Sequence, residues 1–173
     1  MLAPPPVAYA DLMDALIRPV TADDAPALGA VHMACWREAY VHHLSADFLA
    51  RATPESSATR WASTLASLTP DHRLLVAEAG NELLGFAMSG PARGDEPPRD
   101  RELFAIYVRT VAHGTGIAQT LLDGVLGREP AFLWVLDRNP RATAFYARNG
   151  FIDDGATMVL ADFEGNLERR MVR

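Results

Sequence analysis

Short apolar stretches separated by turn residues recur along the chain and predict a set of β-strands. Residues 74–79 and 82–89 flank Gly80-Asn81, a dipeptide typical of a tight hairpin turn, so we expect two antiparallel strands there. Further strands are predicted at residues 17–20, 103–109, 132–136, 156–160 and 167–172, the last two joined as a hairpin around residues 164–166. Residues 90–100 are rich in Gly, Pro and charged side chains, which indicates a loop.

Helices are predicted between these strands, at residues 23–40, 54–68, 116–126 and 140–150. The third has an apolar stripe at helical spacing, formed by Ile117, Leu121, Leu122 and Val125. Proline in the first helical position marks two of the starts, after Thr53 and after Asn139, because the first turn needs no N–H donor there. Gly150 is placed to end the last helix.

This order of elements predicts an α/β fold with one central sheet. Strand–helix–strand units imply parallel pairing and hairpins imply antiparallel pairing. We therefore expect a mixed, mostly antiparallel sheet of about seven strands with helices on both faces. Residues 1–15 contain three consecutive prolines and are predicted to be a loosely attached arm. No boundary separates two apolar cores in the remainder, so residues 16–173 are predicted to form a single domain.

Composition and charge argue against several classes of protein. The 173 residues are 49% hydrophobic and 22% charged, which is typical of a globular domain. The formal net charge of −6 argues against binding to nucleic acid or to an anionic membrane, both of which need a basic face. The longest apolar runs have six residues, far short of the roughly 20 that span a bilayer. The N-terminus lacks the cationic start of a secretory signal, so none is expected.

Two residue types restrict the chemistry. All 16 basic residues are arginine, which excludes a lysine-dependent phosphate loop of the Walker type and Schiff-base catalysis. Cys35 is the only cysteine, so no disulfide can form within the chain, and we expect a cytoplasmic location. No metal site is expected, because the spacing of His32, Cys35, His42 and His43 matches no compact set of ligands.

The segment with the clearest chemical meaning is the Gly-rich turn at residues 113–118, which joins a predicted strand directly to a predicted helix. The first turn of a helix has unpaired N–H groups and a partial positive charge, and glycine lets a ligand approach the backbone closely. The turn is therefore a candidate anion site with a diphosphate as its natural ligand. It does not fit the dinucleotide-binding fingerprint, whose sixth position is glycine, because that position counted from Gly114 is Gln119. Glycines that merely shape a turn are the alternative.

The acetyl-CoA-binding motif Q/R-x-x-G-x-G/A of the GNAT (GCN5-related N-acetyltransferase) superfamily resembles this turn, which reads His113-Gly114-Thr115-Gly116-Ile117-Ala118. His113 replaces the usual Gln or Arg. Other segments resemble further parts of the family and occur in the family's order along the chain, at residues 17–25, 75–78, 84–87, 133–136 and 139–151. The resemblance implies the family's fold and an acetyl-CoA-dependent N-acetyltransferase. Such an enzyme transfers an acetyl group to a primary amine of a small molecule or peptide by direct attack in a ternary complex.

The resemblance also implies roles for individual residues. Those expected to contact the cofactor are Tyr107, Val108, Arg109, Val111, His113, Gly114, Thr115, Gly116, Ile117, Ala118, Asn139 and Tyr146. Asn139 fits a helix N-cap equally well. Tyr146 would lie at the thioester sulfur and act as the acid for the departing thiolate. Glu102 would act as a base through water and contact the acceptor, although an exposed carboxylate at a strand end fits the sequence equally well.

The acceptor site is expected near the first helix. His32, Trp36 and Tyr40 are four residues apart and share one helix face. Trp36 and Tyr40 either form an aromatic wall for the acceptor or pack the helix onto the sheet. The same fold would also allow a non-catalytic acyl-CoA-binding or interaction module, and the Gly-rich turn alone would allow a nucleotide-binding protein. Many members of the family are dimers, so a homodimer is compatible with the resemblance.

Overall fold

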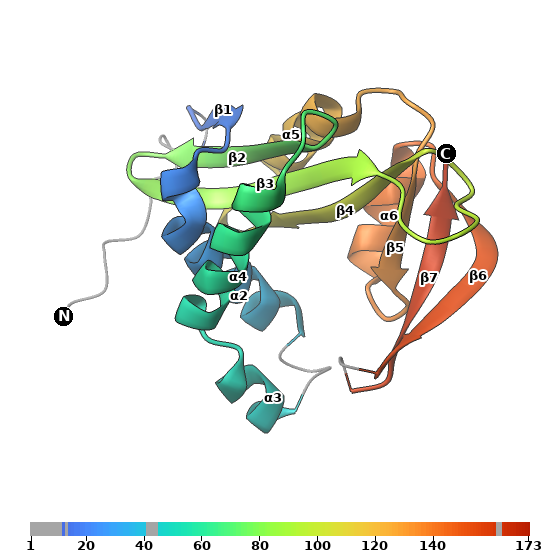
Figure 1. Ribbon diagram of the computed structural model, residues 1–173, viewed down its shortest axis with the longest axis horizontal. Helices are drawn as coiled ribbons and strands as arrows, with labels where there is room; N and C mark the ends of the chain where they lie inside the picture. Colours follow the sequence, from blue (N-terminus) through green and yellow to red (C-terminus); the bar gives the residue numbers. More distant parts are fainter. Residues whose placement is uncertain (1–11, 13, 41–44, 162–163) are drawn as a thin grey trace.

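The structure is a computed structural model that describes the chain except residues 1–11, 13, 41–44 and 162–163. Most of the predicted arm, and also His42 and His43, therefore lie outside the described residues. The described residues form seven strands in one sheet, in the order β1-β2-β3-β4-β5-β7-β6 (Figure 1). Their bounds are β1 (Leu16–Pro19), β2 (Arg73–Ala79), β3 (Glu82–Pro91), β4 (Arg101–Val108), β5 (Phe132–Leu136), β6 (Ile152–Leu160) and β7 (Asn166–Val172). Neighbouring strands are antiparallel except β4 and β5, which confirms the predicted mixed, mostly antiparallel sheet.

Helices cover both faces of this sheet, as predicted (Figure 1). Their bounds are α2 (Ala25–Tyr40), α3 (Ala46–Arg51), α4 (Pro54–Ser67), α5 (Ile117–Leu126) and α6 (Pro140–Arg148), with short 3-10 helices η1 (Ala22–Asp24) and η2 (Thr110–Ala112). On one face, α2 and α4 bury Leu28, Trp61 and Phe86 against the strands. On the other face, α5 and α6 bury Leu121 and Phe151. Within the described part of the chain, no helix has the length and apolar character needed to cross a membrane.

The elements differ from the prediction mainly at their ends. Helix α3 was not predicted; it follows Ser45, whose hydroxyl oxygen accepts a hydrogen bond from Phe48 N at 3.1 Å. Strand β6 begins at Ile152 rather than at residue 156. Its pairing with β7 shifts register between Asp153 and Thr157, where Gly155 has a φ of +85°, so the sequence there resembles a turn although the strand continues through it.

Helices α2 and α4 approach each other most closely at Gly29. An ideal Cβ at this position would lie 2.5 Å from the backbone nitrogen of Ala58 and 2.6 Å from the backbone oxygen of Pro54. Real Cβ atoms do not approach other heavy atoms so closely. The missing side chain at Gly29 therefore sets the distance between the two helices.

His32 belongs to the packing between α2, α4 and the sheet. Its ring lies 4.9 Å from that of Tyr107 and 5.4 Å from that of Phe86, measured between centroids. The Trp61 indole N–H donates a hydrogen bond to His32 Nδ1 at 3.3 Å, so this nitrogen is the unprotonated one. Desolvation, with a smaller effect of the Arg60 charge, lowers the pKa of His32 to about 4.

The lowered pKa of His32 should make the fold sensitive to mild acid. The unfolded chain binds a proton at this histidine near pH 6.5, whereas the folded chain binds it near pH 4, so acid favours unfolding across this interval. We expect the free energy of unfolding to fall by about 2 to 3 kcal/mol between pH 7 and pH 4.5. Urea unfolding at both pH values measures this loss. In His32→Gln the loss over the same interval should be clearly smaller, and an equal loss in both proteins would contradict the assignment.

Candidate active site

A gap between β4 and β5 forms the candidate site, and a β-bulge in β4 opens it. The β3–β4 register shifts between Met88 and Ser89, which leaves Phe104 as an extra residue of β4. A bulge bends its strand and interrupts regular pairing. Within the described residues, β4 pairs with β5 only at Glu102 and Leu103, and the strands then diverge. Main-chain groups on the β5 side of β4 beyond Leu103 therefore have no strand partner and are available to a ligand.

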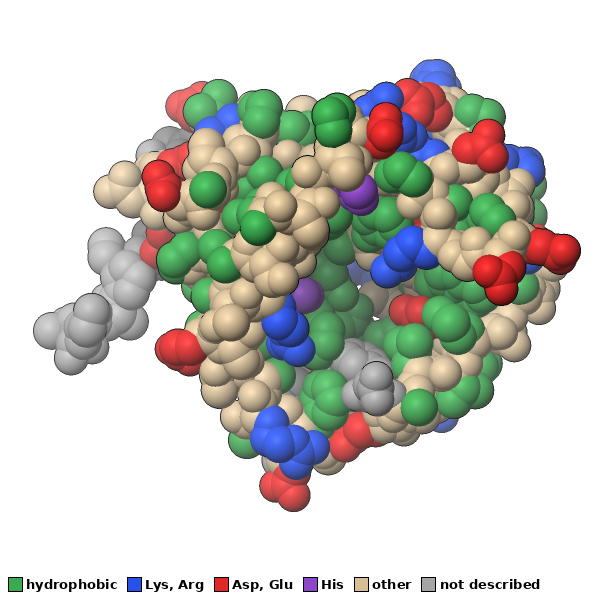
Figure 2. Space-filling view, viewed as in Figure 1, with side chains coloured by type: hydrophobic (Ala, Val, Ile, Leu, Met, Phe, Trp, Pro, Cys, Tyr) green, Lys and Arg blue, Asp and Glu red, His purple; other side chains and the backbone are tan. Residues whose placement is uncertain are grey.

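The gap widens into a cavity of about 1190 Å³. Its walls come from α2, β4, β5, the start of α5, α6 and the β6–β7 hairpin. Figure 2 shows this face of the molecule hollowed between the α2 side and the β6–β7 side. The structure places ten of the predicted site residues in the lining: Trp36, Tyr40, Tyr107, Val108, His113, Gly114, Gly116, Ala118, Asn139 and Tyr146.

The Gly-rich turn presents main-chain N–H groups to this cavity. Gly114 and Gly116 have φ values of +85° and +90°, in the left-handed region that favours glycine. Gly116 is the N-cap of α5 and supplies no side-chain cap; the N–H groups of Ala118 and Gln119 make no hydrogen bond to any described residue. A helix start with free N–H groups attracts an anion. The sequence prediction of an anion site therefore has a geometric basis.

Side chains of the turn are bonded to its own backbone. The Thr115 hydroxyl donates a hydrogen bond to the Ala112 carbonyl oxygen at 2.8 Å. His113 Nε2 lies 2.9 Å from the Val108 carbonyl oxygen, an acceptor, so this nitrogen bears the proton. His113 thus fixes the end of β4 to the turn, a structural task that its position in the motif did not reveal.

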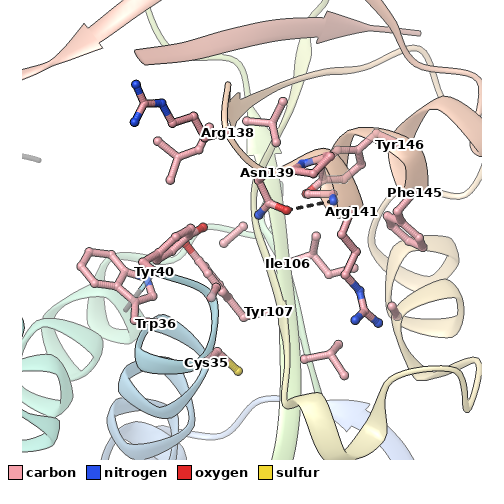
Figure 3. A pocket seen from close by; sticks show the side chains of 18 of the residues that line it. Cys35, Trp36, Tyr40, Ile106, Tyr107, Arg138, Asn139, Arg141, Phe145 and Tyr146 are labelled. Atoms are coloured by element: carbon pink, nitrogen blue, oxygen red, sulfur yellow. Dashed lines mark hydrogen bonds between the residues drawn. The ribbon is translucent and has the colours of Figure 1, made fainter. Parts of the chain in front are cut away.

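Three arginines that the sequence did not single out also line the cavity: Arg138, Arg141 and Arg148. None of them forms an ion pair with a described residue, and Figure 3 shows the Arg138 and Arg141 side chains on opposite sides of the site. Guanidinium groups without an acidic partner make the cavity more attractive to phosphate groups. Arg138 and Arg141 flank the start of α6, and Arg148 is its last residue.

Tyr146 faces the gap from α6, opposite Tyr40 and Tyr107 (Figure 3). The side chain is buried beside Phe145 and Phe151, and its hydroxyl makes no hydrogen bond to any described residue. Burial, with smaller effects of Tyr40 and Glu168, raises the pKa of Tyr146 well above its ordinary value. The phenol therefore stays protonated near neutral pH and can donate its proton to a ligand.

Asn139, Trp36 and Tyr40 each combine two predicted roles. Asn139 caps α6, because its side-chain oxygen accepts a hydrogen bond from Ala142 N at 3.0 Å, and it also lines the cavity (Figure 3). Tyr40 is buried against Leu136, while Trp36 stacks on Phe48 with ring centroids 6.2 Å apart. Both aromatic residues therefore pack α2 onto the sheet and present a wall to the cavity.

Cys35 lines the same wall, but its surroundings do not favour the thiolate that a nucleophile needs. Burial raises the pKa of its thiol to about 12, so the thiol stays protonated near neutral pH. Among the described residues, no group of three or more His, Cys, Asp or Glu side chains could hold a metal ion.

Glu102 does not reach the cavity, which corrects the placement expected from the sequence. It lies before the bulge, where β4 and β5 are still paired, and only 2% of its surface is exposed. Arg93 binds both carboxylate oxygens, at 2.5 and 3.0 Å, and its main-chain N–H donates a third bond at 3.2 Å. This arrangement gives Glu102 a structural partner and does not support its predicted role as base or acceptor contact.

Four of the expected cofactor residues also lie outside the cavity lining: Arg109, Val111, Thr115 and Ile117. Arg109 Nε donates a hydrogen bond to Glu38 Oε1 at 2.7 Å, and Thr110 N binds the other carboxylate oxygen at 2.7 Å. This ion pair links the end of β4 to α2, so the Arg109 guanidinium is occupied by Glu38. Ile117 is buried in the core beneath α5.

Comparison with known proteins agrees with this geometry. The model of the acetyltransferase (GNAT) family matches residues 31–151. The chain is 36% identical over 105 residues to Rv2669 of Mycobacterium tuberculosis H37Rv, an uncharacterized N-acetyltransferase; the match covers 57% of this chain and 64% of that protein. It is 25% identical over 137 residues to the uncharacterized N-acetyltransferase YuaI of Bacillus subtilis, covering 76% of this chain and 77% of YuaI.

Solved structures share the fold. The PaiA N-acetyltransferase of Thermoplasma acidophilum, in complex with coenzyme A, has a TM-score of 0.64 at 20% identity and covers 92% of this chain and 99% of its own. PH1933 of Pyrococcus horikoshii has a TM-score of 0.69 at 17% identity, with 92% and 97% covered. At such identities the likeness concerns the fold alone. The family match begins within α2 and ends at Phe151, just before β6, so it includes the Gly-rich turn and Tyr146, and the chain belongs to the GNAT acetyltransferase family.

Proposed function

We propose that the protein transfers the acetyl group of acetyl-CoA to a primary amine. One observation supports this most directly: a gap between β4 and β5 has the uncapped start of α5 at one end and the Tyr146 hydroxyl at its side. This single cavity offers an anion site for a diphosphate, an open strand edge for an extended arm with amide groups, and a protonated phenol for a thioester sulfur.

The residues present fit coenzyme A. The free N–H groups at the start of α5 suit the diphosphate, and Arg138, Arg141 and Arg148 supply positive charge for the phosphate groups. The unpaired main-chain groups of β4 suit the amides of the pantetheine arm. The PaiA structure was solved with coenzyme A, which supports the same ligand here.

Acyl transfer to an amine needs a proton acceptor, a donor for the oxyanion and an acid for the sulfur. An ordinary primary amine loses a proton at pH 7 at a cost of roughly 4 kcal/mol. A main-chain N–H of β4 near Val108 would stabilise the oxyanion, and such a donor contributes about 3 kcal/mol. Tyr146 would donate its proton to the departing sulfur. Trp36 and Tyr40 would line the acceptor end, and their rings can contact a cation.

Release of free thiol from acetyl-CoA tests the proposal. The protein is incubated with acetyl-CoA and a panel of primary amines, and thiol is followed over time. Amine-dependent thiol release supports acetyl transfer. Binding of coenzyme A in calorimetry without turnover of any amine would instead indicate a non-catalytic acyl-CoA-binding module. If the protein neither binds coenzyme A nor turns over any amine, both functions are refuted.

Gly116→Ala should weaken coenzyme A binding about tenfold, because the added methyl group would stand where a diphosphate approaches the backbone. No protein atom lies within 4 Å of an ideal Cβ at this position, so the group would point into open space. Calorimetry with coenzyme A measures the change.

Gly155→Ala is the matched control. Gly155 has a φ of +85°, close to that of Gly116, and its Cβ would also meet nothing within 4 Å, but it lies in β6 outside the cavity lining. Both variants should lose similar stability, about 1 to 2 kcal/mol, from the left-handed backbone. Only Gly116→Ala should lose affinity; equal affinities would show that the turn does not contact the ligand.

A further inference from the structure

Glu168 is set apart from the other carboxylates that line the cavity. Glu38 is bound by Arg109, Asp137 by Arg169, and Glu164 by the Ser45 hydroxyl. Glu168 also lines the cavity, yet its carboxylate makes no hydrogen bond or ion pair with any described residue. A half-buried carboxylate without a partner is costly for the fold, so Glu168 does not act as a stabilising contact.

The register of the sheet places Glu168 beside the aromatic wall formed by Trp36 and Tyr40. Glu168 on β7 is paired with Leu136 on β5 and with Met158 on β6. Directly opposed residues of antiparallel strands point to the same face of a sheet, so Glu168 shares the face of Leu136, where Tyr40 packs. It therefore lies on the α2 side of the gap, with the aromatic wall rather than with the Gly-rich turn.

Charged and titratable groups from four elements act on Glu168. Tyr40 of α2 and Tyr146 of α6 are both near enough for the Glu168 charge to raise the pKa of each hydroxyl. Two charged side chains in turn affect the pKa of Glu168: the Arg93 charge lowers it and the Glu102 charge raises it. Arg93 is already bound to Glu102. Burial dominates, so the pKa of Glu168 is raised, which makes it a stronger base than an exposed glutamate.

We propose that Glu168 is the base of the reaction and that the acceptors are positively charged primary amines, an inference that rests on the proposed acetyl transfer. The Glu168 carboxylate accepts one proton from the ammonium group, and the freed nitrogen lone pair forms a C–N bond to the thioester carbonyl carbon. The oxyanion that results then re-forms the C=O bond as the C–S bond breaks. Tyr146 donates its proton to the sulfur, which retains the electron pair of the C–S bond. Tyr146 regains a proton from the nitrogen as the amide forms, and Glu168 releases its proton to water.

Glu168→Gln tests this role through the charge of the acceptor. Thiol release is measured with charged alkylamines (phenethylamine, putrescine and amino-acid amides) and with aniline, which is neutral at pH 7. For the charged amines, kcat/KM at pH 7 should fall by about 100-fold, the usual contribution of a general base. The deficit should shrink to under about tenfold near pH 10, where about half of an ordinary alkylamine is already neutral in solution. With aniline, the loss should stay within about threefold, because no ammonium proton has to be removed.

Three controls separate catalysis from structure. Glu82→Gln makes the same chemical change at the start of β3, outside the cavity lining, and should leave every rate unchanged. Glu168→Asp retains the carboxylate and should recover part of the activity. Glu168→Gln should melt no lower than the wild type, because the neutral amide removes a charge that burial disfavours.

Several outcomes would overturn the inference. Equal losses for charged and neutral amines at every pH would show that Glu168 merely shapes the site. If the wild type acetylates none of the charged amines but binds coenzyme A in calorimetry, the acceptor class proposed here is wrong while the cofactor site stands. If coenzyme A does not bind either, the proposed acetyl transfer fails and this inference fails with it.

Discussion

Tyr146→Phe should lower kcat for acetyl transfer about 100-fold while KM for acetyl-CoA changes by less than about threefold. The expected loss is that of a general acid, because the substitution removes only the hydroxyl that would protonate the sulfur. Phenylalanine fills the same space between Phe145 and Phe151, so the packing of α6 is retained. Steady-state thiol release gives both kinetic constants, and calorimetry with coenzyme A verifies that binding is retained.

Stability provides the control for this variant. The Tyr146 hydroxyl makes no hydrogen bond to a described residue, so Tyr146→Phe should melt no lower than the wild type. The raised pKa of Tyr146 also predicts that the wild-type enzyme loses no activity from ionisation of this phenol up to about pH 10. An unchanged kcat in Tyr146→Phe would exclude the hydroxyl as the acid, and a lowered melting temperature would show that its role is structural.

The fold was predictable because its signals are local. Short apolar stretches, the Gly80-Asn81 turn and the Pro54 and Pro140 helix starts each depend on neighbours in the sequence, and the structure confirms them. The opening between β4 and β5 was not predictable in this way. It depends on a register shift at Phe104, and register is a relation between two strands that neither strand's sequence determines alone.

The same distinction between local and long-range signals applies to the residues of the candidate site. The Gly-rich turn could be predicted because Gly114 and Gly116 adopt backbone angles that their own identity allows. The position of Glu102 could not, because its partner Arg93 comes from the preceding loop and holds it before the bulge. Glu168 was missed because β7 lies between β5 and β6, and a residue near the C-terminus thereby reaches the centre of the site.

The second large effect concerns stability, and we expect Gly29→Ala to lower the free energy of unfolding by about 2 to 4 kcal/mol. Helix propensity alone predicts the reverse, since alanine in a helix interior is favoured over glycine by about 1 kcal/mol. At Gly29 the added Cβ would lie 2.5 Å from Ala58 N and 2.6 Å from Pro54 O, both backbone atoms. Backbone cannot rotate away, so α4 would have to move from α2 and the packing of Trp61 would loosen. Urea unfolding measures the loss.

Gly124→Ala separates helix propensity from contact with backbone atoms, because it makes the same substitution inside α5. An ideal Cβ there would lie 2.4 Å from Leu75 Cδ1, the far end of a flexible side chain that can change rotamer. The gain in helix propensity then offsets most of the repacking, and we expect a change within about 1 kcal/mol. The contrast between the variants tests whether backbone contact decides the outcome. Equal losses in both would mean that α4 adjusts to a larger residue as readily as Leu75 does, and that Gly29 does not set the spacing of the helices.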